Sequence, residues 1–150
     1  MYTVDASVWV NSFDQREPGH DISRRLLEQL RDHVVPVILP SLVLAEVAGA
    51  VSRTRNNPAQ ALAFASAIGQ LPNLTLVPLD ASVAHQATQL AAQHGLRGAD
   101  SVYAAVAVQA NCTLVTLDNE HLTRLIGIVP THRPIHALAL LTPTSGETTE

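Results

Sequence analysis

The sequence predicts an α/β fold in which helices flank both faces of a central parallel sheet of four to five strands. Short apolar runs alternate along the chain with segments whose apolar residues recur at helical spacing. Short apolar strands that alternate with helices are typical of a parallel sheet covered on both faces, a three-layer sandwich. The length of 150 residues is enough for one such domain and its core.

The first 70 residues are expected to contain two strands and four helical segments. A polar loop at residues 14–20 precedes a helix whose apolar residues lie on one face. Pro40 closes the second strand, and Ser41 is positioned to cap the next helix. These elements are strands Tyr2–Val4 and Val37–Leu39 and helices Ala6–Phe13, Ile22–Asp32, Ser41–Val51 and Pro58–Gly69.

The rest of the chain continues the alternation. Asp80 is a favoured N-cap for a helix that Gly95 ends, and a last short strand is expected at Ile128 and Val129. Pro134 argues against a regular helix through His132 and His136, so this segment is interpreted as a surface loop. The other elements are strands Leu74–Val77 and Thr113–Thr116 and helices Asp80–His94, Ala99–Ala110 and Asn119–Ile126. Residues 1–141 form the domain, and the polar residues 142–150 are expected to be a frayed tail.

The composition limits the possible functions. Charged residues make up 15% of the chain, against about 25% in typical soluble proteins, which suggests that a partner or a second copy covers part of the surface. Candidates for that surface are the Ala-rich segments Ala59–Ile68 and Gln86–Ala92. A net charge of −4 argues against general binding to a phosphate backbone, but two bound divalent cations would offset it.

Other classes of protein are excluded by what the sequence lacks. Cys112 is the single cysteine, so neither a disulfide framework nor a cysteine zinc site is expected. No stretch reaches the roughly 20 apolar residues of a membrane span, and the N-terminus resembles no signal peptide, which predicts a cytoplasmic protein. Motifs of a Ser-His-Asp triad or a phosphate-binding loop are also missing.

The strongest functional signal is a set of acidic residues in apolar surroundings, Asp5, Glu46, Asp100 and Asp118. A carboxylate is costly to remove from water unless it is hydrogen-bonded, paired with a cation or bound to a metal. Apart from Arg97, no Lys or Arg lies within three positions of any of them. Scattered carboxylates that share one need for compensation indicate a hard divalent cation, Mg²⁺ or Mn²⁺.

Simpler roles compete with metal binding for each acid. Asp5, Asp100 and Asp118 each precede a helical pattern and could be N-caps. Glu46 is expected inside a helix among apolar neighbours, where its alternative is an ion pair with a distant Arg. The segment Thr116–Glu120 places a hydroxyl and two acids at one strand end, and its alternative is a solvated turn.

The order and spacing of these acids resemble the PIN domain, in particular the VapC-type toxins of prokaryotic toxin–antitoxin pairs. The resemblance covers about residues 1–130 and rests on Val4–Val10, Glu46, Gly98–Ala107 and Leu114–Glu120. It implies a PIN-like sandwich and a Mg²⁺- or Mn²⁺-dependent endoribonuclease that forms a dimer and is neutralised by a cognate antitoxin. The chain departs from the family in Glu120, where Asp is commoner, and in His121, where Phe is commoner.

The resemblance also implies roles for individual residues. The catalytic acids are Asp5, Glu46, Asp100 and Asp118, and with Glu120 they form the metal-ligand set. Metal-activated water would attack the phosphorus and leave a 5′-phosphate and a 3′-hydroxyl. Ser7 and Thr116 would orient ligands or water. Arg53, Arg55 and Arg97 are weaker candidates for RNA contacts.

Two other functions remain open. A non-catalytic module could keep the fold and act through protein contacts alone, which a test for bound Mn²⁺ would discriminate. A metal-dependent phosphatase of the haloacid dehalogenase kind would need an Asp-x-Asp nucleophile and a Lys. Asp5 is followed by Ala6 and Ser7, and the chain has no Lys, so this function fits less well.

Overall fold

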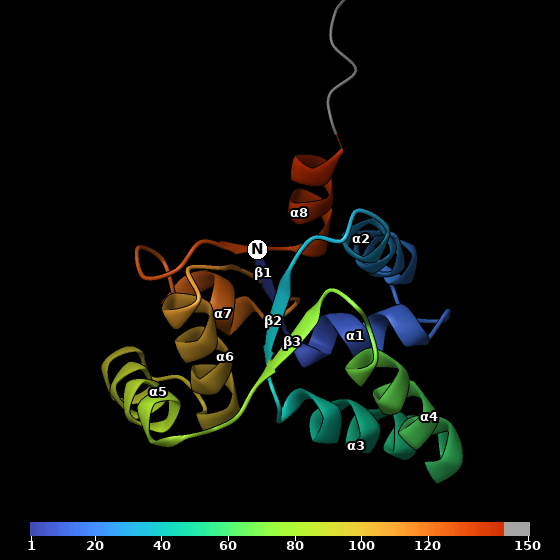
Figure 1. Ribbon diagram of the computed structural model, residues 1–150, viewed down its shortest axis with the longest axis horizontal. Helices are drawn as coiled ribbons and strands as arrows, with labels where there is room; N and C mark the ends of the chain where they lie inside the picture. Colours follow the sequence, from blue (N-terminus) through green and yellow to red (C-terminus); the bar gives the residue numbers. More distant parts are fainter. Residues whose placement is uncertain (143–150) are drawn as a thin grey trace, which may run out of the picture.

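A five-stranded parallel sheet forms the centre of the computed structural model, which describes residues 1–142. The strands lie in the order β3-β2-β1-β4-β5, so the first strand of the chain is the middle of the sheet (Figure 1). All four strand pairs are parallel, which confirms the predicted sheet. The strands are β1 (Tyr2–Val4), β2 (Val37–Pro40), β3 (Leu74–Val77), β4 (Thr113–Val115) and β5 (Thr131–His132).

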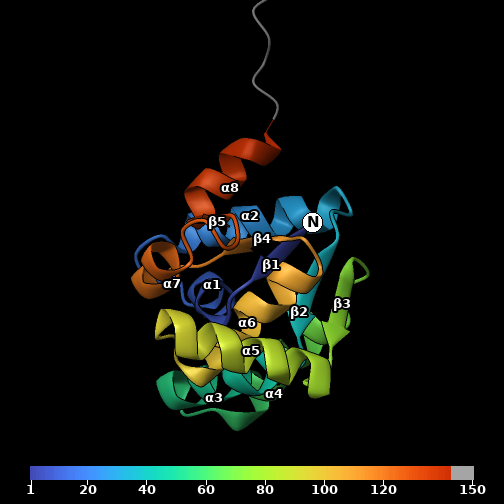
Figure 2. The same cartoon turned by 90° about the vertical axis from the view of Figure 1, so that its left-hand side faces the viewer.

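Helices cover both faces of this sheet. One layer contains α5, α6 and α7, and the opposite side carries α1 to α4, with α8 packed against α2 (Figure 1). Seen from the side, α5 lies outside α6 (Figure 2). The helices are α1 (Ala6–Phe13), α2 (His20–Asp32), α3 (Val43–Arg55), α4 (Pro58–Gly69), α5 (Ala81–His94), α6 (Gly98–Gln109), α7 (Asn119–Arg124) and α8 (Pro134–Leu141).

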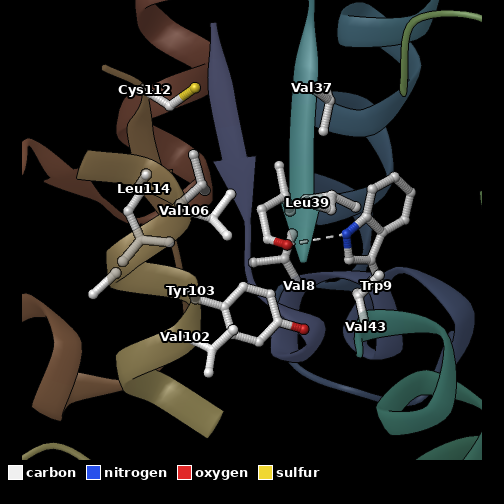
Figure 3. Close-up of a cluster of buried hydrophobic side chains, with 14 of the residues drawn as sticks. Val8, Trp9, Val37, Leu39, Val43, Val102, Tyr103, Val106, Cys112 and Leu114 are labelled. Carbon is white, nitrogen blue, oxygen red and sulfur yellow. Dashed lines mark hydrogen bonds between the residues drawn. The ribbon is translucent and has the colours of Figure 1, made fainter. Parts of the chain in front are cut away.

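The core fixes α6 against the sheet. Every residue of 101–107 on this helix is buried, because one side faces the strands and the other faces α5. Figure 3 shows Tyr103 of α6 near Val8 and Trp9 of α1, where β1 and β2 end. The Trp9 indole N–H donates a hydrogen bond to the Val4 carbonyl oxygen at 3.2 Å. Tyr103, in the second turn of α6, therefore lies close to the carboxyl end of β1 (Figure 3).

Several predicted element boundaries are wrong. The last strand lies at Thr131–His132, where it pairs with β4, and not at residues 128–129. The expected loop His132–His136 instead contains the start of α8, because Pro134 occupies its first turn, where the missing N–H costs no hydrogen bond. Ser41 does not cap α3, which begins later, at Val43, and continues to Arg55.

Two further predictions concern the chain's ends and its relation to membranes. Within residues 1–142, no helix has both the length and the apolar character that a bilayer span requires. The predicted frayed tail, residues 142–150, lies outside the described part of the chain except for Thr142.

Candidate active site

Asp5 lies directly after β1, at the carboxyl edge of the sheet, and is 7% exposed. Its backbone N–H donates to the Val115 carbonyl oxygen at 2.9 Å, which continues the pairing of β1 with β4. Its Oδ2 accepts hydrogen bonds from the hydroxyls of Ser7 at 2.5 Å and Thr116 at 3.1 Å. Asp5 occupies the N-cap position of α1, but its side chain makes no capping bond. The carboxylate is thus oriented by two side-chain hydroxyls and not by backbone N–H groups of the helix.

Asp100 lies in the first turn of α6, where Arg97 occupies the cap position, so capping does not explain it either. Its Oδ2 is buried and has no hydrogen-bond partner among the described residues. The nearest basic side-chain nitrogens are the Arg97 Nε, 4.0 Å from Oδ2, and the His121 Nε2, 3.8 Å from Oδ1. Burial raises the pKa of Asp100, and the negative charges of Asp5 and Asp118 raise it further, although His121 and Arg97 act in the opposite direction.

Glu46 belongs to the first turn of α3, since that helix begins later than predicted. No Lys or Arg of the described chain pairs with it, so the predicted ion-pair alternative is wrong there. Its Oε2 instead accepts a 2.6 Å hydrogen bond from the Tyr103 hydroxyl. Burial raises the pKa of Glu46, the Tyr103 bond opposes this, and the charges of Asp5 and Asp100 raise it again.

Asp118 does act as a helix cap. Its Oδ1 accepts the backbone N–H of Glu120 at 2.7 Å, at the start of α7. The Asp118 N–H in turn donates to the Thr116 hydroxyl at 2.9 Å, which ties this turn to the same hydroxyl that holds Asp5. Asp118 can cap α7 and still bind a metal ion, because the cap uses only one of its two carboxylate oxygens.

Glu120 faces arginines. Its Oε2 lies 3.9 Å from the Arg97 Nε, and its Oε1 lies 3.6 Å from the Arg124 Nη2. Arg97 therefore stands between two acids at the rim of the site, and its side chain is 70% exposed. Glu120 therefore has an arginine near each of its carboxylate oxygens, whereas Asp100 has a buried oxygen without a hydrogen bond.

The other two candidate arginines lie in different surroundings. Arg55 pairs with the Asp14 carboxylate at 3.0 Å, and its guanidinium lies over the Phe13 ring, 5.6 Å from the ring centre. The hydrogen bonds from Arg16, with a smaller contribution from the Arg55 charge, lower the pKa of Asp14 to about 2. Arg53 is exposed on α3. Of these two residues, Arg53 is the one without an ion pair in the described chain.

Several of the predicted acids are close enough for their charges to interact, but within residues 1–142 they do not form a complete ligand set. Asp5 and Asp118 raise the pKa of Asp100, and Asp5 and Asp100 raise that of Glu46, so these carboxylates act on one another through space. Within residues 1–142, no three acidic, histidine or cysteine side chains are arranged around one point that could hold an ion. A complete set is not required for Mg²⁺, which keeps several water ligands and often uses only one or two carboxylates. The observation that favours a cation is the buried Asp100 Oδ2, which has no hydrogen-bond partner in the described chain.

Two residues of the site were not assigned a role from the sequence. Tyr103 binds Glu46, and the fully buried His121 lies between Thr116 and Asp100. Tyr103 lies one helical turn after Asp100, a spacing that places both on one face of α6. For His121 the available signal was its departure from the Phe that is commoner in the resembled family.

Comparison with known proteins identifies the family. A model described as the PIN domain matches residues 2–125. The chain belongs to the PIN domain family. All the candidate acids lie within the matched residues.

Solved structures share the fold of this PIN domain. VapC20 from Mycobacterium tuberculosis, a toxin that cleaves the sarcin-ricin loop, has a TM-score of 0.68 at 20% identity over 79% of this chain and 91% of its own. FitAcB from Neisseria gonorrhoeae has a TM-score of 0.69 at 23% identity, over 91% of this chain and 99% of its own. VapBC2 from Rickettsia felis, bound to promoter DNA, has a TM-score of 0.66 at 22% identity, over 88% of this chain and 97% of its own. None of the curated proteins matches the chain.

Proposed function

We propose that this PIN domain is a metal-dependent endoribonuclease, the cytoplasmic toxin of a toxin–antitoxin pair. The observation that supports the proposal is the mutual charge interaction of Asp5, Glu46, Asp100 and Asp118, which come from four separate segments of the chain. Their charges repel one another, and Asp100 keeps a buried oxygen without a hydrogen bond. Folded proteins rarely keep such a cluster unless a cation binds it.

In this proposal, Asp5, Asp100 and Asp118 hold Mg²⁺ or Mn²⁺, with Glu46 and Glu120 as further ligands directly or through water. The bound ion supplies an activated water and neutralises charge on the phosphate. Ser7 and Thr116 keep the Asp5 carboxylate in one orientation, because both donate to the same oxygen.

RNA is the proposed substrate because VapC20, which shares the fold, cleaves an RNA loop. Arg97 is placed to meet a phosphate, since it is exposed and lies at the rim of the acid cluster. Arg53 is a second candidate, whereas Arg55 would first have to leave Asp14. The test is incubation of the purified chain with labelled RNA and Mn²⁺. Cleavage that is lost in Asp5→Asn supports the proposal.

A non-catalytic PIN module is the remaining alternative, favoured by the incomplete ligand arrangement among residues 1–142. A measurement of Mn²⁺ binding by the metal-stripped protein distinguishes the two functions. Binding that Asp100→Asn weakens supports the nuclease, and absence of binding supports the module.

The Tyr103 hydroxyl is expected to contribute to cleavage through Glu46. Tyr103→Phe removes the hydrogen bond that offsets part of the burial of this carboxylate, so Glu46 should be protonated or displaced more often. We expect kcat to fall about tenfold with little change in KM, as for other residues that support ligands. Tyr2→Phe is the matched control, because Tyr2 begins β1, at the end of the strand opposite to Asp5. Equal kcat for wild type and Tyr103→Phe would contradict this role.

A homodimer is proposed from an apolar hollow of about 700 Å³ between α5 and α6. Its lining includes Ala87, Ala91 and Ala92 of the predicted segment Gln86–Ala92, together with Leu79, which is 53% exposed. Light scattering at micromolar concentration should give the dimer mass for the wild type and the monomer mass for Leu79→Asp. Ile126→Asp, an exposed site on the α7 side, should leave the dimer unchanged. A monomeric wild type would exclude the dimer.

An antitoxin is the other proposed partner. Three structures of similar fold, from Rickettsia felis, Klebsiella pneumoniae and Salmonella typhimurium, are toxin–antitoxin complexes or carry the paired name VapBC. Co-expression with the product of a neighbouring short reading frame, followed by co-purification, tests this pairing.

A further inference from the structure

His121 is the most completely enclosed ionisable group near the acid cluster. It lies in α7 and has 0% exposure. Its Nδ1 is 3.2 Å from the Thr116 Oγ1, on the segment that follows β4. Its Nε2 is 3.3 Å from the Asp100 carbonyl oxygen and 3.8 Å from the Asp100 Oδ1, on α6. One ring therefore contacts two elements that each carry part of the site.

The contact with Thr116 extends to the other acids. The Thr116 Oγ1 donates to the Asp5 Oδ2 at 3.1 Å and accepts the Asp118 N–H at 2.9 Å. A continuous chain of polar contacts thus runs from Asp100 through His121 and Thr116 to Asp5. Each nitrogen of this buried imidazole faces a polar atom of the site, and which nitrogen donates depends on the tautomer.

We propose that His121 is a positioning residue that sets the spacing of the Asp5 and Asp100 carboxylates for the cation. The inference rests on the proposed metal-dependent function. A Phe ring, the commoner residue at this position in the resembled family, could fill a similar volume but would make neither polar contact. The simpler alternative is that His121 only fills space in the core, and that alternative predicts no effect of Phe on metal binding.

Three substitutions separate positioning from packing. His121→Phe keeps an aromatic ring and removes both contacts. His121→Asn can keep the contact on the Nδ1 side, and His121→Gln can keep the one on the Nε2 side. His20→Phe is the matched control, because His20 is also buried but its Nδ1 faces the Asn11 carbonyl oxygen at 3.1 Å.

The experiment measures Mn²⁺ affinity of each full-length, metal-stripped variant by the electron paramagnetic resonance signal of free Mn²⁺, with melting temperature as a check of folding. We expect Kd for Mn²⁺ to rise 10- to 100-fold in His121→Phe, as for residues that orient metal ligands, and less in His121→Asn or His121→Gln. His20→Phe should keep the wild-type Kd.

The outcomes distinguish this inference from the proposed function. If the wild type binds Mn²⁺ and a folded His121→Phe binds it equally well, the positioning role is overturned and the nuclease proposal stands. If His121→Phe does not fold, wild-type affinity in both His121→Asn and His121→Gln overturns the role, and a weaker affinity in either supports it. A wild type that binds no Mn²⁺ overturns the proposed function and this inference with it.

Discussion

Asp100→Asn is expected to abolish RNA cleavage, by about a thousandfold or more, without unfolding the protein. The carboxamide fills the same space, but it loses the negative charge that would hold the ion. Metal ions contribute several kcal/mol to stabilising the transition state of phosphoryl transfer, which corresponds to this loss in rate. The measurement is single-turnover cleavage of labelled RNA in Mn²⁺. Asp80→Asn is the control. Asp80 caps α5 by accepting the backbone N–H of Val83, so this variant should cleave RNA normally.

The same variant should be at least as stable as the wild type when no metal is present. Folding raises the pKa of Asp100, so the folded state holds its proton more tightly than the unfolded state does. Wild-type stability in EDTA should therefore decline as pH rises from the ordinary pKa of Asp to the raised one. Asp100→Asn removes the part of this decline that Asp100 causes, while Glu46, whose pKa is also raised, keeps its own part. Thermal melts across that pH range test whether wild-type stability declines as pH rises. Undiminished cleavage by purified Asp100→Asn would exclude Asp100 from the chemistry.

Removal of metal is expected to have an equally large effect. The metal-stripped protein should not cleave RNA, and added Mg²⁺ or Mn²⁺ should restore activity. Oxygen ligands favour these hard ions, and no Cys or His cluster within residues 1–142 would favour zinc. Ca²⁺ is expected to support little turnover, because its larger and looser coordination shell misplaces the attacking water.

The ends of the RNA products identify the nucleophile. Attack by water leaves a 5′-phosphate and a 3′-hydroxyl, which end-specific enzymes and mass spectrometry distinguish. Asp5→Asn with each added ion controls for a contaminating nuclease. Cleavage that persists in EDTA would overturn the metal requirement. Products that end in a 2′,3′-cyclic phosphate would show that the RNA's own 2′-hydroxyl attacks. The acid cluster would then need another explanation.

Elements with strong local signals are predictable from the sequence of this chain. The bounds of α4 and β3 agree with prediction, because Pro58 and Asn57 define the start of the helix and short apolar runs define the strand. The end of α5 also agrees, since Gly95 adopts a positive φ of 65° that suits glycine. The start of α8 was missed because Pro134 was interpreted as a helix breaker, although proline is favoured in a first turn.

The candidate acids were also visible in the sequence, since a carboxylate with apolar neighbours and no nearby Lys or Arg needs compensation from elsewhere. Their individual partners were not visible. Glu46 and Tyr103 are 57 residues apart, and Asp5 and Thr116 are 111 apart. Which of the three candidate caps acts as one also depends on geometry, and only Asp118 does so.

Local sequence was enough to predict the class of fold, the order of most elements and the candidate acids, because periodicity, caps and isolated charges are properties of short segments. Three contacts could be found only in the folded chain: the Tyr103 hydrogen bond to Glu46, the Arg55 pair with Asp14, and the His121 contacts with Asp100 and Thr116. These contacts join residues from different elements. They depend on side-chain distances of about 3 Å, which the packing of helices on the sheet sets and local sequence does not.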